Sequence, residues 1–298
     1  MIVRTLFLLL LLTNTAFAMR DTPSVQYQYQ NQSVTYIGST TGNGYEFNPE
    51  GKKKITMVTL DWPPYIGTDV CHKGWAFQLA IAVLTSQNYA VTVRFLPWSR
   101  AVLEAEQGKA DILFPEYFIE DTAPSDFMTD VPRKELLGLS RPFPGGNISF
   151  MKRRGEAVAF NGNLDSIKGM KIGVVRGYQN FPEFDAMMDA GAFKKFEAID
   201  DLQLMKLLIG KRVDMVIGDP KVLRHTVAHS KMPQITKNKI LHNVEEVQPS
   251  LKYNPLYFAV SKNKPGWHLL LSDINIALHQ FTRSGELHRI IKENSRCD

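Results

Sequence analysis

The sequence Lys171-Ile-Gly-Val-Val-Arg-Gly-Tyr-Gln-Asn180 joins a short apolar segment to a glycine turn, and Phe181-Pro182 follows directly. Ile172 to Val175 is typical of a buried strand, Gly177 permits a tight turn, and the residues from Phe181 onward have the pattern of a helix. Free backbone N–H groups and the helix dipole favour an anion at such a helix start. The segment therefore indicates either an anion-binding loop or an ordinary strand-to-helix turn of an α/β domain.

Apolar strands and periodic helices alternate on both sides of this segment. Before it, the pattern predicts strands at 55–60, 91–96 and 110–114 and helices at 75–87 and 99–107; after it, a helix at 202–209, strands at 214–217 and 256–261, and a helical region at 267–292. Alternation of this kind predicts a sheet with helices on its faces. The rhythm weakens between Asp121 and Pro144, so we expect two α/β lobes.

The N-terminal residues predict export. Residues 1–18 combine Arg4, an apolar run and Ala16-Phe17-Ala18, which together are typical of a cleavable signal peptide. Removing those 18 residues from 298 leaves 280, enough for two lobes of ordinary size. Residues 19–51 are polar and show no sustained apolar period, so we expect a poorly ordered or peripheral arm.

Composition excludes several classes of function. The net charge of +5 is spread along the chain, which makes nucleic-acid binding a weak inference. No zinc-protease helix, nucleophile elbow, phosphate loop or dinucleotide fingerprint is present, so we expect no metal, no cofactor and no covalent chemistry. The two cysteines, Cys71 and Cys297, are candidates for a disulfide in an exported protein, although sequence alone does not show that they come within bridging distance.

The ordered set of motifs resembles the extracellular solute-binding proteins of family 3, which are periplasmic receptors associated mainly with polar amino acids. The matching stretches run from about residue 54 to 293: Asp61-Trp-Pro-Pro-Tyr65, Gly74-Trp75, Pro97-Trp-Ser-Arg-Ala101, Gly108-Lys-Ala-Asp111, Ser140-Arg-Pro-Phe143, Leu164-Asp-Ser-Ile-Lys-Gly169, Gly173 to Tyr178, Gly210-Lys-Arg-Val-Asp214 and Val216-Ile-Gly-Asp219.

The resemblance implies a bilobal α/β type II periplasmic-binding-protein fold. Lobe 1 would comprise 52–145 plus 255–298 and lobe 2 would comprise 146–254, with two crossings as the hinge. A small solute would bind between the lobes and close them, and a monomeric periplasmic protein would then present the closed shape to an ABC permease.

The chain departs from the family where amino-acid receptors usually carry a carboxylate clamp. Their Thr-Pro-Glu-Arg turn is replaced here by Ile119-Glu-Asp-Thr122, and Ala76 and Gln78 stand where acidic residues are common. Arg100 and Arg176 are candidates for a substitute clamp, because a guanidinium pairs with a carboxylate through two hydrogen bonds. A standard α-amino acid is therefore a doubtful ligand.

Other candidate ligand-binding residues are aromatic or acidic. Aromatic faces could stack on a ring or cover an ammonium group, and carboxylates could accept from a ligand amine. The aromatic candidates are Trp62, Tyr65, Trp98, Phe114, Tyr117 and Tyr178; the acidic ones are Asp61, Glu116 and Asp219, and Gly177 belongs to the loop itself. Core packing is an equal alternative for Trp98 and Phe114, and helix capping is an equal alternative for Asp219. For Asp61, support of the local Trp-Pro-Pro loop is the favoured interpretation.

The leading prediction is a periplasmic solute-binding protein that delivers a small polar, amino-acid-like or carboxylate-bearing solute to an ABC-type transporter and performs no catalysis. One alternative is an enzyme on the same scaffold that resembles periplasmic cyclic-acid dehydratases, which requires an acid such as Glu116 with a raised pKa in the cleft. A second alternative is a sensory or partner-binding module that uses lobe closure as a signal.

Overall fold

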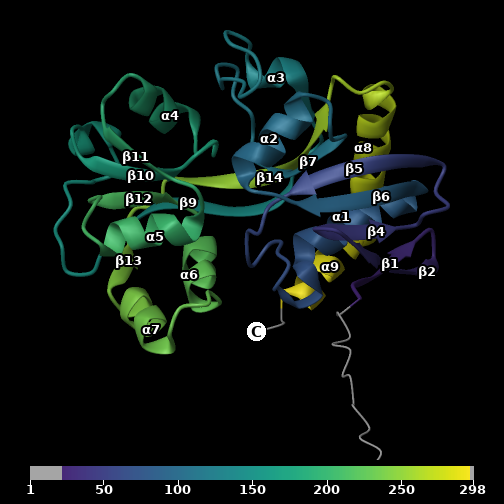
Figure 1. The fold of residues 1–298 in the computed structure, drawn as a ribbon, viewed down its shortest axis with the longest axis horizontal. Coiled ribbons are helices and arrows are strands. Elements are labelled where there is room, and N and C mark those ends of the chain that lie inside the picture. Colours follow the sequence, from purple (N-terminus) through teal and green to yellow (C-terminus); the bar gives the residue numbers. More distant parts are fainter. Residues whose placement is uncertain (1–21, 296–298) are drawn as a thin grey trace, which may run out of the picture.

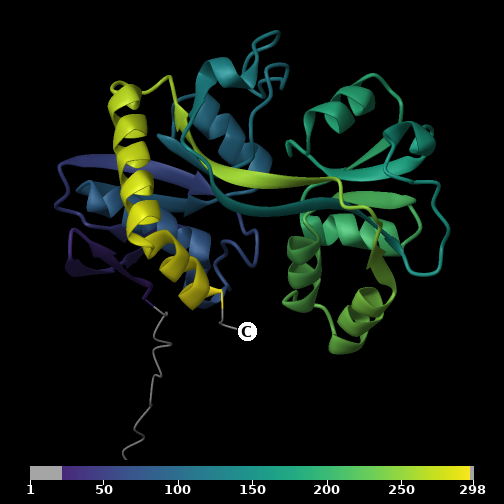
Figure 2. The ribbon, with the colours of Figure 1, turned by 180° about the vertical axis from the view of Figure 1, so that it is seen from behind.

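A computed structural model of the protein describes residues 22–295, so the expected signal peptide and Cys297 lie outside the described part. The chain forms two α/β lobes side by side, joined by two long strands (Figure 1). These strands are β9 (Phe143–Arg153) and β14 (Lys252–Ser261), which pair antiparallel with each other from Lys252 opposite Ile148 to Leu256 opposite Phe143. Seen from behind, they run together between the lobes and form the hinge (Figure 2).

The first lobe is built on the parallel strands β5, β6 and β7, which bury apolar side chains. Its elements are β3 (Ser39–Thr41), β4 (Gly44–Phe47), β5 (Lys53–Thr59), α1 (Trp75–Ser86), β6 (Tyr89–Phe95), α2 (Trp98–Glu106), β7 (Ile112–Glu116), α3 (Arg133–Leu136), β8 (Leu137–Leu139), α8 (Trp267–Ser284) and α9 (Glu286–Asn294), with a short 3₁₀ turn at Cys71–Lys73. Helix α1 is apolar on nearly every side because it packs against β1, β6, α8 and α9.

The second lobe is a smaller sheet covered by helices. Its elements are β10 (Lys171–Val175), α4 (Pro182–Asp189), β11 (Lys194–Ala198), α5 (Asp201–Ile209), β12 (Met215–Gly218), α6 (Pro220–Ala228), α7 (Gln234–His242) and β13 (Val244–Glu246), preceded by a 3₁₀ turn at Leu164–Ile167. Strand β10 lies parallel to both β11 and β12, and β12 pairs antiparallel with β9. The carboxyl ends of β10 and β12 face the first lobe, where loops commonly bind ligands.

The expectation of a poorly ordered N-terminal arm is wrong for the described residues. Strands β1 (Ser24–Tyr29) and β2 (Gln32–Ile37) form an antiparallel hairpin, and β4 pairs with β6. Val25 and Tyr27 are buried, because β1 packs on α1 and α9, and the Tyr27 hydroxyl lies 3.1 Å from Thr85 Oγ1. Polar and apolar residues alternate along β1, as expected for a half-buried strand. The alternation covers only this short strand, so residues 19–51 as a whole showed no sustained period.

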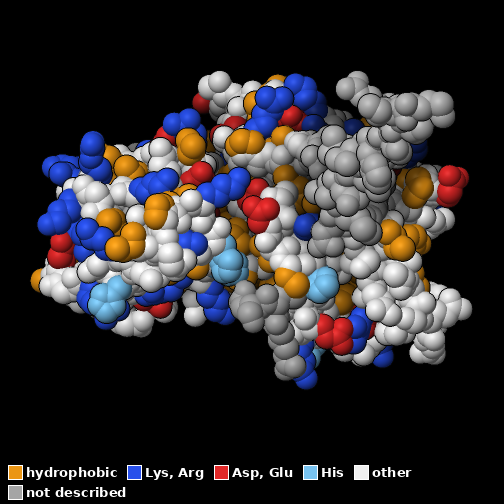
Figure 3. Space-filling view, turned by 60° about the horizontal axis from the view of Figure 1, so that its bottom comes forward, with side chains coloured by type: hydrophobic (Ala, Val, Ile, Leu, Met, Phe, Trp, Pro, Cys, Tyr) orange, Lys and Arg blue, Asp and Glu red, His pale blue; other side chains and the backbone are white. Residues whose placement is uncertain are grey.

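Charged side chains on the surface are dispersed. In the space-filling view, Lys and Arg side chains occur over much of the second lobe but alternate with uncharged side chains (Figure 3). This distribution is in keeping with the even spread of charge along the sequence. No helix within residues 22–295 is both long enough and apolar enough to span a membrane.

Candidate functional site

A cavity lies between the two lobes, and both lobes and the hinge contribute to its walls. It is lined by Leu60, Trp62, Trp98, Pro115, Glu116, Tyr117, Tyr178, Gln179 and Leu256. These residues lie at the ends of β5 and β7, at the start of α2, in the loop after β10 and in β14. In this closed form the cavity volume is about 20 Å³, or about 280 Å³ when all the space between the lining atoms and the open mouth is counted.

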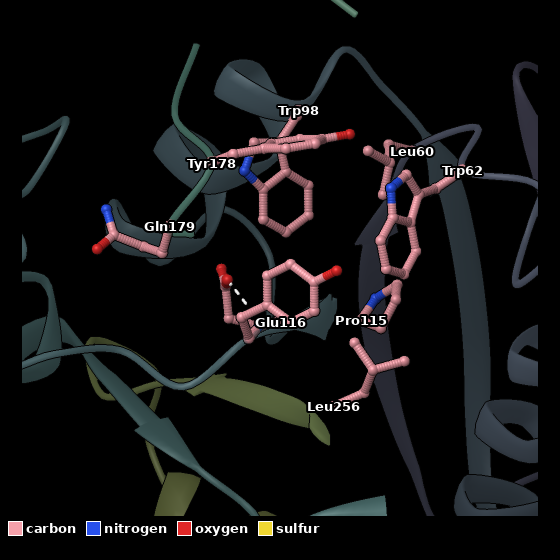
Figure 4. A pocket seen from close by; sticks show the side chains of 9 residues that line it. Leu60, Trp62, Trp98, Pro115, Glu116, Tyr178, Gln179 and Leu256 are labelled. Atoms are coloured by element: carbon pink, nitrogen blue, oxygen red, sulfur yellow. Dashed lines mark hydrogen bonds between the residues drawn. The ribbon is translucent and has the colours of Figure 1, made fainter. Parts of the chain in front are cut away.

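Aromatic rings form most of the walls. In Figure 4, Trp98 and Tyr178 lie on one side of the space, Trp62 on a second, and Glu116, Pro115 and Leu256 opposite the first. Trp62 stacks on Tyr65 with 4.5 Å between ring centroids and meets Tyr117 edge-on at 5.7 Å. Trp98 and Tyr178 meet edge-on at 6.0 Å, although they belong to different lobes.

Direct hydrogen bonds hold the lobes together around the cavity. The indole N–H of Trp98 donates to the Gly177 carbonyl at 3.0 Å, and Arg133 Nη1 donates to the same oxygen at 3.4 Å. On another side, the Tyr65 hydroxyl donates to Asp219 Oδ2 at 2.6 Å. The structure is therefore a closed form, in which a solute in the cavity would be shielded from water.

Glu116 is the carboxylate in the cavity wall. Its side chain is 2% exposed, Oε1 accepts from the backbone N–H of Tyr117 at 2.9 Å, and Oε2 is buried without a hydrogen-bond partner among the described residues. Burial raises the pKa of Glu116 to about 7, against the opposing effects of Arg133 and the Tyr117 N–H. The group is thus a partly protonated acid near neutral pH.

Two further carboxylates are buried behind the cavity. Asp201 accepts from the Tyr178 hydroxyl at 2.9 Å, and burial raises the pKa of Asp201 to about 7. Burial also raises the pKa of Asp219, although the hydrogen bonds from Tyr65 and from the Lys221 backbone N–H oppose that rise. Asp219 thus caps α6 as well as bridging the lobes, so both of its expected roles occur together.

The expected arginine clamp does not line the cavity. Arg100 is paired with Glu104 and its side chain is 65% exposed, while Arg176 is paired with Glu197 and is 61% exposed. Both side chains are solvated on the surface, because a carboxylate on the same helix or the adjacent strand satisfies each of them.

The anion-binding interpretation of the loop after β10 is also corrected. The N–H groups of Arg176, Tyr178 and Asn180 donate to Ala198 O, Val175 O and Asp185 Oδ2 respectively. The loop instead directs the Gly177 carbonyl toward donors of the first lobe, and Gly177 has the positive φ of 80° that the turn requires. The ordinary strand-to-helix turn is the better description.

Two other candidates are structural. Phe114 is fully buried and packs against Phe143 and Phe258, with ring centroids 5.5 and 4.4 Å away. Asp61 Oδ1 accepts from the Thr68 N–H and hydroxyl, so Asp61 supports its own loop. The cavity thus brings together five of the predicted residues: Trp62, Trp98, Glu116, Tyr117 and Tyr178.

Sequence reasoning missed several residues of the site. Leu60, Pro115, Gln179 and Leu256 line the cavity; the first three directly adjoin a candidate, whereas Leu256 begins a predicted strand that carried none. Arg133 was missed because it lies in the region where the helix and strand pattern weakens. It is 1% exposed and pairs with Glu106 at 3.1 Å and Asp126 at 3.3 Å. No sequence pattern indicated Arg133, because only the fold brings it next to Gly177.

No group of three or more His, Cys, Asp or Glu side chains suited to a metal ion occurs within residues 22–295. The expected Cys71–Cys297 disulfide involves a residue outside the described part and stays a prediction.

Comparison with known proteins finds likeness at the level of fold. No family model and no curated protein matches the sequence. An ancestral arginine-binding protein bound to arginine is 20% identical, with a TM-score of 0.63, over 80% of this chain and 97% of that one. An arginine transport periplasmic binding protein from Legionella pneumophila is 14% identical, with a TM-score of 0.63, over 82% and 100%. A histidine kinase sensor domain similar to periplasmic binding proteins is 18% identical, with a TM-score of 0.63, over 80% and 95%. These likenesses confirm the bilobal type II periplasmic-binding-protein fold.

Proposed function

We propose that the protein is a periplasmic solute-binding protein that captures a small polar solute between lobe 1 (52–145 and 255–298) and lobe 2 (146–254). The cavity supports this proposal, because its walls come from both lobes and the hinge, and hydrogen bonds from Trp98 and Tyr65 close it. A solute that contacts both lobes would favour the closed form in proportion to its differential affinity for that form.

Transport is the leading role for such capture. Closure creates a composite surface from both lobes, which a membrane permease of the ABC type can distinguish from the open form. Similar solved structures include an amino acid ABC transporter substrate-binding protein from Streptococcus pneumoniae bound to L-arginine. The fold also occurs in a histidine kinase sensor domain, so signalling by the same closure is a second candidate.

An enzyme is a third candidate, because Glu116 satisfies one condition that a dehydratase-type mechanism requires. It is a buried acid in a closed cleft with its pKa raised to about 7. A carboxylate that only binds a solute would show the same burial, so recovery of the solute after binding separates the two roles.

A thermal-shift screen of the mature protein, residues 19–298, tests solute capture. A solute at about a hundred times its Kd should stabilise the protein by about 2.7 kcal/mol. Recovery of the hit unchanged supports a receptor, and recovery of a product supports the enzyme. Uptake of the labelled hit by cells with and without the protein then separates transport from sensing, and a screen without any hit contradicts solute capture.

A further inference from the structure

We propose, building on the proposed function, that the solute is a small organic cation with N–H donors and no carboxylate, whose ammonium group binds Glu116 and whose carbon skeleton packs between the aromatic walls. This assignment replaces the carboxylate-bearing solute expected from sequence. It follows from the acceptor, the walls and the charges of the cavity, taken in turn.

The acceptor is Glu116 Oε2. This oxygen is buried in the cavity wall and has no hydrogen-bond partner within residues 22–295, whereas Oε1 is satisfied by the Tyr117 N–H. Buried polar atoms in folded proteins are nearly always paired, and one left unpaired is costly. A solute N–H at this position would complete the pairing, and a positively charged donor would do so most strongly.

The walls present mostly ring faces. The Trp98 N–H already donates to Gly177 O and the Tyr178 hydroxyl to Asp201, so neither group is free to donate to a solute. Ring faces attract a cation through their quadrupoles, and the attraction is strongest where water is excluded. The Tyr117 hydroxyl, which is buried without a partner among the described residues, offers a second polar contact.

The charges around the cavity exclude an anion. No Lys or Arg among the described residues lines the cavity. Arg133, the cation with the largest effect on the pKa of Glu116, already pairs with Glu106 and Asp126. Asp201 and Asp219 add buried carboxylates on the other lobe. A carboxylate solute would meet like charges without a compensating cation, and such burial is strongly unfavourable.

This arrangement makes binding depend on pH. Glu116 faces Arg133, Glu106 and Asp126. Burial, helped by the two carboxylates, outweighs the effects of Arg133 and of the Tyr117 N–H and raises the pKa of Glu116 to about 7. A bound cation favours the ionised carboxylate, so the affinity for a cation should rise as the pH increases through about 7 and level off above that pH. At pH 7, binding should release roughly half a proton, because Glu116 is about half protonated in the free protein.

The test uses four-carbon probes of similar size that carry positive, neutral or negative groups. Calorimetry at pH 7.5 compares butylamine and putrescine with 1-butanol and 1,4-butanediol, which are neutral, and with butyrate and succinate, which are anionic. Tetramethylammonium tests the need for an N–H. We expect only the amines to bind, with proton release at pH 7 detected in buffers of different ionisation enthalpy.

Matched variants test the residue. Glu116→Gln should weaken amine binding at least about tenfold and abolish proton release, whereas Glu183→Gln, an exposed acid on α4, should change neither. If Glu116→Gln does not fold, Trp62→Leu gives the same test for the walls, with a severalfold loss expected for amines.

The outcomes separate the two proposals. Tight binding of an anionic or neutral solute without amine binding overturns the cation assignment and leaves solute capture intact. Absence of binding by these probes and by every solute in the broader screen overturns both.

Discussion

Glu116→Gln should stabilise the protein without solute, and the gain should appear only at neutral and higher pH. The wild-type carboxyl is 2% exposed and its pKa is raised from 4.5 to about 7 because burial disfavours the charged form. The folded state therefore holds the proton more tightly than the unfolded state. This contribution to stability is complete below about pH 4.5 and is lost as the pH rises through about 7.

The magnitude follows from the two pKa values. Each pKa unit corresponds to about 1.4 kcal/mol, so ionising Glu116 in the folded protein costs about 3 kcal/mol above pH 7. Glutamine has the same shape and stays neutral, so it avoids this cost, and its side-chain oxygen can keep the hydrogen bond from the Tyr117 N–H at 2.9 Å. Buried Asp201 and Asp185 also have raised pKa values, but they are common to both proteins and cancel in the comparison.

Urea unfolding followed by tryptophan fluorescence at pH 4.5 and pH 8 measures the effect. We expect Glu116→Gln and wild type to have similar free energies of unfolding at pH 4.5, and the variant to be more stable by up to about 3 kcal/mol at pH 8. Glu183→Gln, exposed on α4, is the control and should follow wild type at both pH values. A difference between Glu116→Gln and wild type that is the same at both pH values would refute the reasoning.

Three further predictions concern closure, the arginine and the cysteines. Tyr65→Phe removes the 2.6 Å hydrogen bond to Asp219 and should weaken binding of the identified solute about tenfold with the fold intact; an unchanged Kd by calorimetry would show that this bond does not contribute to closure. Arg176→Ala should leave that Kd within about twofold, because an exposed ion pair contributes little, and a tenfold loss would place Arg176 in the site. Intact mass of the mature protein after alkylation without reductant should show no modified Cys71 or Cys297, and two alkylations would contradict the disulfide.

Much of the fold could be predicted from the sequence because its strands and helices have strong periods. The strand at Lys171–Val175 begins one residue before the predicted Ile172 to Val175, and α1, α2, α5 and β6 lie within two residues of the predicted ranges. The region at 267–292 was predicted as one helical segment but is divided at Gly285, where φ is 79°. Its apolar residues keep helical spacing across that glycine, so the period alone did not reveal the break.

The site could be predicted only in part. Aromatic residues at the ends of strands were found, because the carboxyl ends of parallel strands gather at one edge. The placement of Arg100 and Arg176 in the site is not what the structure has. The charge of an arginine indicates which ligand it could bind, but it does not show that a nearby carboxylate of the protein already pairs with it, as Glu197 does with Arg176. Arg133 is the opposite case, a residue near the site that was not predicted. Its pairing with Glu106 joins residues 27 positions apart in the sequence, which only the fold brings together.

The path of the chain through the two lobes determines the order in which they can be completed during synthesis. The second lobe takes β10 through α7 from one continuous stretch. The first lobe, in contrast, needs β14 from the end of the chain to pair with β7, and α8 and α9 to cover α1. Domains generally fold as units and N-terminal parts emerge first. A nascent chain that ends near residue 250 would thus carry the elements of the second lobe beside a first lobe whose central helix is uncovered. The apolar side chains of α1 would then be the surface most exposed to chaperones until the remaining residues after about 250, roughly one sixth of the 298, have been made.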